Sequence, residues 1–418
     1  MGKSFEDIFK IIGPFGRYQA LIHFILALIT IPTGLYAFII IFTQDIPDHY
    51  CKNPTLSNYN FTNDEIKSYS IPYSIDEKCG KIIYSDCYEY NAPWSELCGD
   101  GSCSKQDLEN YSKVYANDTV KCQNGYEWLF SEPDRTSEPV EFELVCGNGE
   151  AWQVVSTSGY YLGCAIGSIL GGWLLDSFGR KNVVFITGIF LSGSLVACGF
   201  ANTPWLYAIM RCLVGALGQL YYIGAFIYSQ ELTPEKWRAK LGFVYHINFI
   251  WGQYLVVLWG WAFKDWRLAN QTIAGLFIFL ICLLFLDESP QYTHRTGKAD
   301  QTLKSLLIIA KRNKKKDVSV SELKTVLSDI DVDITTSNYT IWNLFSYSRE
   351  MTLVTLKSGY LWIAASMVYY GLGLNAGNLP GDIYMNTAIS ATIDLIAHII
   401  FPFFMDWPKL GRKYTITG

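Results

Sequence analysis

The sequence predicts an all-α integral membrane protein with eight membrane-spanning helices. Half of its 418 residues are hydrophobic and only 17% are charged, whereas soluble proteins carry about 25% charged residues. The apolar residues stand in blocks of about 20, the length of helix that crosses a hydrocarbon core about 30 Å thick. Backbone in lipid must satisfy its own hydrogen bonds, so each block is expected to be helical.

These blocks define the predicted organisation of the chain. The expected membrane helices are residues 18–43, 152–175, 182–201, 205–229, 240–263, 268–286, 355–376 and 384–405. The first block is too long for the apolar region of a cleavable signal peptide. The chain is therefore expected to divide into 1–17, helix 1 at 18–43, a long loop at 44–151, helices 2–6 at 152–286, a second long loop at 287–354, helices 7–8 at 355–405, and an end segment at 406–418.

Lysine and arginine residues are unevenly shared between the two sides of these spans. The short connections on the far side from the N-terminus carry only Lys264 and Arg267. The short segments on the N-terminal side carry Lys3, Lys10, Arg17, Arg180, Lys181, Lys236, Arg238, Lys240, Lys409, Arg412 and Lys413. The positive-inside rule therefore predicts a cytoplasmic N-terminus, most simply in the plasma membrane, with the 44–151 loop outside.

Seven of the eleven cysteines fall in the loop that is expected outside: Cys51, Cys79, Cys87, Cys98, Cys103, Cys122 and Cys146. The same loop carries glycosylation sequons at Asn60, Asn110 and Asn117. Clustered cysteines with sequons indicate a disulfide-bonded, glycosylated exterior. A zinc module is the alternative, although paired Cys-x-x-Cys ligands are absent from the sequence. Because seven is odd, one thiol is free or pairs elsewhere, and the connectivity stays open.

Charge is also divided along the chain. Residues 45–150 contain 20 Asp/Glu and 8 Lys/Arg, a net of −12, which leaves +7 to the rest of a chain whose formal net charge is −5. This division does not suggest a nucleic-acid-binding protein. The basic run at 311–316 in the second long loop forms either the solvated face of short cytoplasmic helices or a contact with anionic inner-leaflet lipid.

A charged motif lies between the second and third expected helices. It reads Gly172-x-x-x-Asp176-x-x-Gly179-Arg180-Lys181, and it resembles the loop signature of the major facilitator superfamily. A related pattern from Asp406 to Lys413 follows the eighth helix, with two extra residues between acid and glycine and with Arg412 at 232 residues from Arg180. The resemblance implies two six-helix bundles repeated in parallel. The chain would then hold the first bundle and two helices of the second.

Two further charge motifs resemble those of sugar-porter-like and organic-ion carriers: Glu231-x6-Arg238, and Asp287-Glu288-Ser289-Pro290. The resemblance implies that Glu231 faces Arg180 and Arg238 and that Glu288 pairs with bases of the second bundle. Ordinary charged loop ends are the alternative. The resulting candidates for a cytoplasmic gate are Asp176, Arg180, Lys181, Glu231, Arg238, Glu288 and Arg412.

The long first loop and its flanks narrow the resemblance. The N-terminal run Gly13-Pro14-Phe15-Gly16-Arg17-Tyr18-Gln19, the run Phe142-Glu143-Leu144-Val145-Cys146, and Tyr369-Tyr370-Gly371-Leu372 with Gly381-Asp382-Ile383-Tyr384 resemble the organic cation, organic anion and carnitine transporter family. That resemblance implies transport of small organic ions (cations, anions or zwitterions such as carnitine) by alternating access. Facilitators of this kind have twelve helices, so a non-transporting fragment or a regulatory partner is the alternative.

Aromatic residues of the expected helices are the candidates for substrate binding, since rings that face a cavity can hold an organic cation by cation–π attraction. Helix packing and the interfacial aromatic belt are the alternatives. The candidates are Tyr36, Tyr160, Tyr161, Tyr221, Tyr222, Trp362, Tyr369 and Tyr370.

Three ionisable residues within the expected helices are also functional candidates, because such groups are costly in lipid. Asp394 lies near the middle of helix 8, either at the substrate site or satisfied by a neighbouring helix. His398 follows one helical turn later, and contact with Asp394 would make transport pH-sensitive. Arg211 in helix 4 serves either coupling or packing against Gln253 or a carbonyl.

The sequence contains no nucleotide-binding loop, no His-Glu-x-x-His and no Gly-x-Ser-x-Gly motif. We therefore expect no enzymatic activity and no cofactor, with energy coming from gradients. The expected partners are a small organic ion and the lipid bilayer, with no nucleic acid, and an oligomer through the outer loop is a further possibility. A receptor or channel would need a ligand-domain or filter motif, and none is present.

Overall fold

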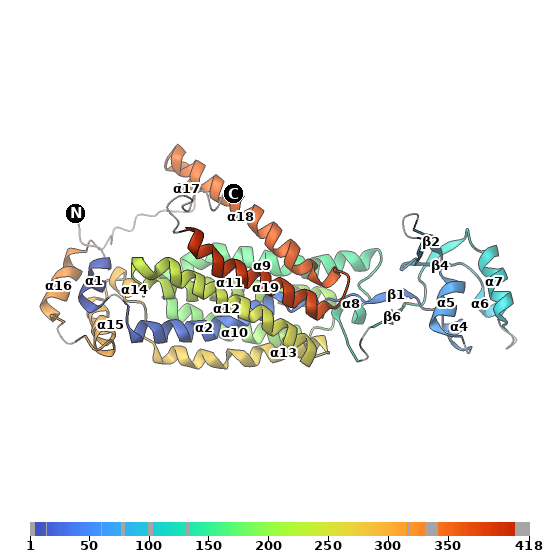
Figure 1. The fold of residues 1–418 in the computed structure, drawn as a ribbon, viewed down its shortest axis with the longest axis horizontal. Coiled ribbons are helices and arrows are strands. Elements are labelled where there is room, and N and C mark those ends of the chain that lie inside the picture. The colour runs from blue at the N-terminus through green and yellow to red at the C-terminus, as the bar shows by residue number, and fades with distance from the viewer. Residues whose placement is uncertain are drawn as a thin grey trace. The chain divides into compact units, whose positions relative to one another are not determined.

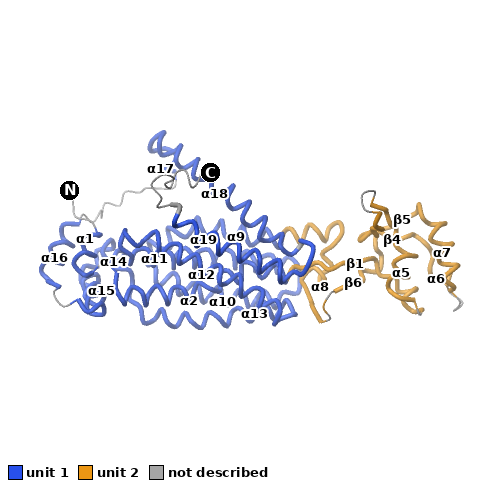
Figure 2. The backbone as a smooth tube through the Cα atoms, in the orientation of Figure 1, with its two compact units in different colours: residues 1–42, 156–418 blue, residues 43–155 orange. Residues whose placement is uncertain are grey.

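The computed structural model describes residues 5–13, 15–59, 61–76, 80–98, 103–130, 132, 134–315, 318–330 and 342–405. The chain forms two compact units (Figure 2). A helical unit contains residues 1–42 and 156–418, and a cysteine-rich unit contains residues 43–155.

Eight helices of the described chain are long and apolar enough to cross a membrane, and the predicted all-helical membrane fold is confirmed. Each overlaps one expected span. Their bounds are α2 Arg17–Phe38 with α3 Ile40–Thr43, α9 Asn148–Phe178, α10 Arg180–Cys198, α11 Pro204–Glu231, α12 Glu235–Ala262, α13 Trp266–Ile273 with the 3-10 helix η1 Ala274–Phe285, α18 Arg349–Leu374 with η2 Asn375–Asn378, and α19 Ile383–Met405.

The ends of these helices follow from local chemistry. Gly179 lies between α9 and α10 with φ +93°, a conformation that favours glycine, so the chain can turn within one residue. The Asp265 carboxylate accepts the backbone N–H groups of Arg267 at 2.7 Å and Leu268 at 3.2 Å. This N-cap begins the sixth span at Trp266, two residues before the expected start.

Close helix contacts depend on small residues. A Cβ atom added at Gly163 of α9 would lie 2.0 Å from the carbonyl oxygen of Cys212 in α11, and one at Gly215 would lie 2.0 Å from the carbonyl oxygen of Tyr160. The two backbones therefore touch, as is common in membrane bundles, where small residues permit tight packing. In the same bundle α12 packs against both α2 and α19 (Figure 1).

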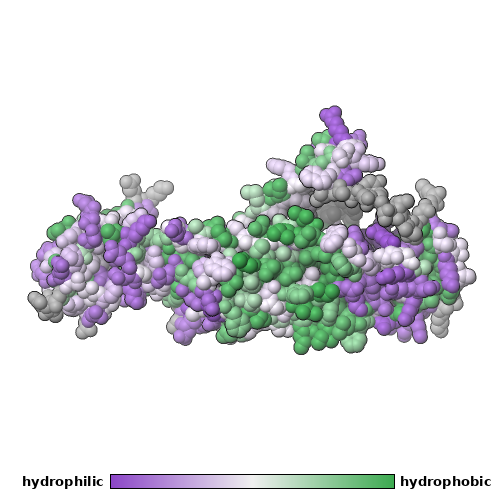
Figure 3. Space-filling model, turned by 180° about the vertical axis from the view of Figure 1, so that it is seen from behind, coloured by the Kyte–Doolittle hydropathy of each residue, from purple (hydrophilic) through white to green (hydrophobic). Residues whose placement is uncertain are grey.

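The surface of the helical unit is zoned by polarity. Figure 3 shows a hydrophobic band over its middle and hydrophilic surface at one end. Short helices form that end: α1 Phe5–Ile12, α14 Pro290–Arg295, α15 Ala299–Arg312 and α16 Val320–Asp329, with α17 Asn343–Ser346 preceding α18. The band is suited to contact with lipid tails, because monomeric soluble proteins rarely expose so large an apolar area.

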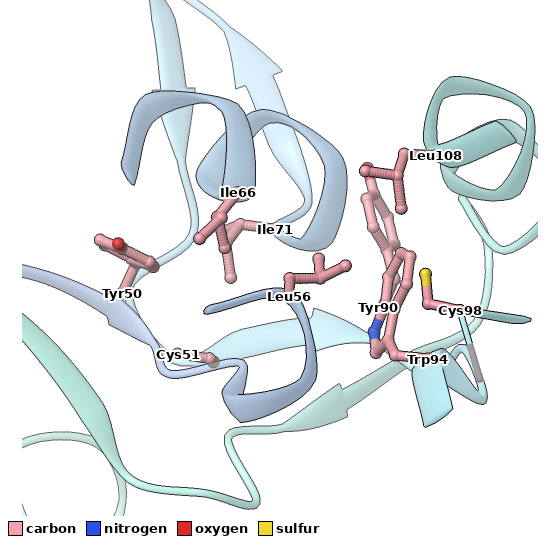
Figure 4. Close-up of a cluster of buried hydrophobic side chains, with 9 residues drawn as sticks. All are labelled: Tyr50, Cys51, Leu56, Ile66, Ile71, Tyr90, Trp94, Cys98 and Leu108. Carbon is pink, nitrogen blue, oxygen red and sulfur yellow. The ribbon is translucent and has the colours of Figure 1, made fainter. Parts of the chain in front are cut away.

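The cysteine-rich unit is a mixture of short helices and three antiparallel strand pairs. The strand pairs are β1 Asp48–Cys51 with β6 Tyr126–Leu129, β2 Tyr73–Ile75 with β3 Ile82–Tyr84, and β4 Tyr88–Tyr90 with β5 Thr119–Lys121. The helices are α4 Pro54–Ser57, α5 Asn63–Ser70, α6 Trp94–Leu97, α7 Lys105–Val114 and α8 Glu138–Glu141. Residues of β1, β4 and α4 to α7, and the residues that follow α5 and α6, form a small apolar core (Figure 4): Tyr50, Cys51, Leu56, Ile66, Ile71, Tyr90, Trp94, Cys98 and Leu108.

Three disulfides close this unit: Cys51–Cys122, Cys87–Cys146 and Cys98–Cys103. They supply the connectivity that spacing alone left open. The seventh cysteine, Cys79, lies outside the described residues, as does the sequon residue Asn60. The other two sequon residues, Asn110 and Asn117, are exposed. Among the described residues no group of His, Cys, Asp and Glu side chains could hold a metal ion.

Candidate functional site

Aromatic side chains from four helices meet inside the helical unit. Tyr370 of α18 lies 5.0 Å from Tyr161 of α9 and 6.2 Å from Phe38 of α2, measured between ring centroids. Phe38 also lies 6.0 Å from Phe249 of α12, and Tyr369 lies 5.2 Å from Tyr370. We call these five rings the aromatic cluster. It brings together three of the candidate residues with two that were not predicted.

A carboxylate borders the aromatic cluster. The Tyr369 hydroxyl donates to Asp394 Oδ2 at 2.9 Å and accepts a hydrogen bond from Gln253 Nε2 at 2.7 Å. His398 Nδ1 lies 3.1 Å from Asp394 Oδ1 and 3.0 Å from the Asp394 carbonyl oxygen. The contact expected from the one-turn spacing of His398 and Asp394 is therefore present. The side chains of Asp394 and His398 are 15% and 28% exposed, so both are partly open at the surface of the described chain.

A second histidine faces this pair from α12. The His246 ring lies 6.0 Å from the His398 ring, and its Nδ1 is 2.7 Å from the hydroxyl of Tyr222 in α11. The candidate Tyr222 thus contacts His246, whose ring faces the pair of His398 and Asp394. Polar groups from α11, α12, α18 and α19 therefore gather beside the aromatic cluster.

Four other candidates are not part of the aromatic cluster, although the Tyr160 ring lies 5.3 Å from the Tyr161 ring. Tyr36, Tyr160 and Tyr221 are buried in helix packing. Tyr36 packs onto the backbone at Gly218, and the Tyr221 hydroxyl donates to the carbonyl of Ile29. Trp362 is 74% exposed on α18 and points away from the bundle. The structure thus separates packing tyrosines from those that have solvent-accessible polar neighbours.

Arg211 of α11 is fully buried against α9 and α2. Its guanidinium lies 4.8 Å from the Tyr160 ring centroid, and its Nη1 donates to the carbonyl of Tyr36 at 3.4 Å. The sequence predicted that Arg211 packs against Gln253 or a carbonyl, and the carbonyl contact is present. The predicted contact with Gln253 is wrong, because the Gln253 amide donates to the Tyr369 hydroxyl instead.

Sequence reasoning missed Phe38, Phe249, His246 and Gln253 as neighbours of the site. His246 and Gln253 lie seven residues apart on α12, so one helix face carries both, since seven residues complete about two turns. This pattern of polar residues at i and i+7 in an apolar span was the available signal.

The second candidate region lies where α9 ends and α10 begins. Arg180 is 3% exposed. Its Nη2 contacts Asp176 Oδ1 at 2.8 Å and Glu231 Oε1 at 2.9 Å, and its Nε donates to Glu231 Oε1 at 3.0 Å. The expected contacts of Arg180 with Asp176 and Glu231 are therefore present. The Ser289 hydroxyl donates to the other Glu231 oxygen, so these charges join four helix ends.

One contact expected in this region, that of Arg238 with Glu231, is wrong. A candidate base for Glu288, Arg412, lies outside the described residues; among the described residues the Glu288 carboxylate accepts the backbone N–H groups of Arg180 and Lys181 at 3.1 Å each. It caps the start of α10, where backbone N–H groups lack helical partners. Arg238 lies 3.8 Å from Glu6 of α1 rather than against Glu231.

The remaining gate candidates stand apart. Lys181 donates its Nζ to the carbonyl of Leu286 at 2.5 Å, and Arg412 lies outside the described residues. The charged connections described here therefore tie together parts of the first six helices.

The fold and these charged turns define a multi-helix membrane carrier. A family model described as "Sugar (and other) transporter" matches residues 102–418. The chain belongs to this transporter family within the major facilitator superfamily, which consists of membrane transporters and not enzymes.

Curated relatives are similar along nearly the whole chain. Organic cation transporter 1 of Caenorhabditis elegans is 28% identical, over 99% of this chain and 68% of its own length. Organic cation/carnitine transporter 2 of Mus musculus is 27% identical, over 100% of this chain and 72% of its own length. The predicted resemblance to organic cation and carnitine transporters is confirmed.

Among solved structures, a major facilitator proton:xylose symporter bound to 6-bromo-6-deoxy-D-glucose matches with a TM-score of 0.56 and 15% identity. The match covers 93% of this chain and 69% of the symporter. At this identity the match supports the fold, and substrate questions depend on the residues of the chain itself.

Proposed function

We infer that this chain transports small organic cations, with Asp394 and the aromatic cluster as the binding site. The observation that carries this assignment is a solvent-accessible carboxylate beside several tyrosine rings. A carboxylate supplies a counter-charge, and ring faces attract a cation by about 0.5–2 kcal/mol each. The names of the relatives, which transport organic cations and carnitine, support the same substrate class.

The exposure of the two opposite charges favours a cation over an anion. Asp394 is partly exposed and has room for a further partner, whereas the guanidinium of Arg211 is covered by Tyr160 and is inaccessible. A substrate that enters from water therefore meets the acid and not the base.

Transport would proceed by alternating access, in which the first bundle and the later helices tilt about this site. The Arg180 contacts with Asp176 and Glu231 would act as a latch at the charged end of the first bundle. Membership of a transporter family favours this function over a non-transporting regulatory partner.

The proposal includes an orientation. The charged end would face the cytoplasm of a cell with this protein in its plasma membrane, and the cysteine-rich unit would lie outside. The exposed Asn110 and Asn117 side chains and the three disulfides support this side for that unit. The β2–β3 hairpin exposes Ile75 at 62% and Tyr73 at 55%, which makes it the best candidate for oligomer contacts through this loop.

The test is counterflow of labelled tetraethylammonium into liposomes that contain the purified 418-residue protein. We expect Asp394→Asn to lower uptake at least about tenfold, the effect of about 1.4 kcal/mol of lost binding. Asp382→Asn is the matched control, because Asp382 caps the same helix by accepting the Met385 N–H at 2.9 Å and asparagine caps equally well. Uptake by Asp394→Asn at the wild-type rate, or counterflow of benzoate in place of tetraethylammonium, would overturn the assignment.

A further inference from the structure

Two histidines face each other between the first six helices and the last two described spans. His246 lies on α12 and His398 on α19, with ring centroids 6.0 Å apart. The elements α12 and α19 pack directly against each other. A hydrogen bond between Tyr254 and Thr392 crosses the same contact at 2.8 Å, and one from Gln253 to Tyr369 joins α12 to α18 at 2.7 Å. Any change in the charge of these imidazoles therefore acts on a surface that must move during alternating access.

The titratable groups around the pair come from every neighbouring element. Tyr222 reaches His246 from α11, Tyr245 precedes it on α12, and Tyr369 reaches Asp394 from α18. The nearest ionised group to His398 is Asp394, at 3.1 Å. The tyrosines stay neutral near pH 7 because an unperturbed phenol has a pKa of about 10. The two imidazoles are thus the groups whose protonation changes the charge of this site.

One carboxylate here can serve two alternative cations. When His398 is protonated, it neutralises Asp394, since opposite charges at this distance attract. An organic cation that binds Asp394 brings a second positive charge against the imidazolium. Like charges disfavour each other's charged form, so the imidazolium loses its proton as the cation arrives. His246, facing His398 at 6.0 Å, opposes a second bound proton in the same way.

We propose that Asp394, His398 and His246 form a proton-binding site that a proton and the transported cation occupy in turn, so that the carrier exchanges one organic cation for one proton. The proposal rests on the proposed function, because it takes the same carboxylate as the cation site. Nδ1–H of His398 stays directed at Asp394, and the proton on Nε2 passes to water when the cation binds. One positive charge replaces one positive charge, and the exchange is electroneutral.

The experiment uses liposomes that contain the purified 418-residue protein, with the voltage clamped by potassium and valinomycin. Labelled tetraethylammonium is offered outside while the interior is about one pH unit more acidic. One-to-one exchange then permits about tenfold accumulation, since a factor of ten corresponds to about 1.4 kcal/mol. The readout is the ratio of uptake with the gradient to uptake without it. We expect a high ratio for wild type and for His49→Gln in the cysteine-rich unit, and a ratio of one for His398→Gln.

A second measurement does not depend on a variant. Tetraethylammonium added to wild-type protein in weakly buffered detergent solution near pH 6.5 should release protons, followed with a pH-sensitive dye. Wild-type counterflow without accumulation and without proton release would overturn the exchange while leaving cation transport intact. Accumulation by His398→Gln at the wild-type ratio would overturn the assignment to these residues. Absence of any wild-type counterflow would overturn cation transport and the exchange together.

Discussion

Arg180 offers the sharpest test of how the charged end is held together. The substitution Arg180→Met keeps an unbranched apolar stem and removes the guanidinium. It takes away both donors that reach Glu231 Oε1, at 2.9 and 3.0 Å, and the contact with Asp176 at 2.8 Å. The two carboxylates are left in very different surroundings, and the magnitude of the effect follows from that difference.

The Glu231 side chain is 11% exposed, whereas that of Asp176 is 70% exposed. Breaking a buried ion pair by removing one partner costs about 3–5 kcal/mol, because an uncompensated charge stays buried. An exposed ion pair contributes only about 0–1 kcal/mol. Arg180→Met should therefore lower the free energy of unfolding by about 3–5 kcal/mol, and Asp176→Asn by less than about 1 kcal/mol.

The double variant Arg180→Met/Glu231→Gln removes the stranded carboxylate as well. It should recover part of the loss, with an interaction energy of about 1–3 kcal/mol between the two sites. The assay is unfolding by SDS titration in mixed micelles, followed by tryptophan fluorescence. Counterflow in liposomes adds the functional readout: a latch residue should slow tetraethylammonium transport without weakening its binding.

Two results would refute this reasoning. One is an Arg180→Met variant no less stable than Asp176→Asn, which would mean that Glu231 finds water or another donor. The other is a double variant whose loss equals the sum of the single losses, which would mean that the two charges act independently. Wild-type turnover in Arg180→Met would remove the latch role while leaving the stability argument in place.

The remaining predictions concern folding. Loss of the Cys51–Cys122 disulfide, with a sequence separation of 71, should destabilise the cysteine-rich unit more than loss of Cys98–Cys103, with a separation of 5. The expected difference is about 2 kcal/mol, because an unfolded chain gains more entropy when a longer loop is opened. Guanidinium unfolding of the paired alanine variants measures this difference, and equal losses would contradict the prediction. Gly163→Ala should destabilise the bundle by about 1–3 kcal/mol through overpacking. Gly172→Ala on the same helix, where an added Cβ meets nothing within 4 Å, should be neutral or slightly stabilising, and identical SDS midpoints for the two variants would count against close α9–α11 contact.

The length and apolarity of the blocks were enough to predict the membrane fold. They predict spans well because the bilayer sets both a minimum length and a requirement for helical backbone. The contact of Arg180 with Glu231 was also predicted, because the resemblance to the charge motifs of carriers implies it. The backbone contacts of Glu288 were not predicted, because a carboxylate near a helix start can bind either a basic side chain or free backbone N–H groups. Sequence alone does not separate these outcomes.

The site was predictable only within single helices. The contact of His398 with Asp394 follows from their one-turn spacing. The meeting of His398 with His246, and of Tyr369 with Gln253, depends on the relative register of α12, α18 and α19. Helix periodicity gives the face of the helix on which a residue lies, but not its position along the axis relative to a residue of a neighbouring helix. Arg238 was missed for a similar reason, since α1 had no assigned place and supplies Glu6 as its partner.

The central claim is that water and a small cation reach the aromatic cluster beside Asp394 in the membrane core. The most direct measurement places a cysteine at Tyr370 in a chain in which Cys79 and the free cysteines of the described residues, Cys164, Cys198, Cys212 and Cys282, are replaced by alanine. A membrane-impermeant cationic methanethiosulfonate reagent should modify this thiol in liposomes, and tetraethylammonium should slow the modification. Lack of modification from either side of the membrane, or a rate that tetraethylammonium leaves unchanged, would contradict the account.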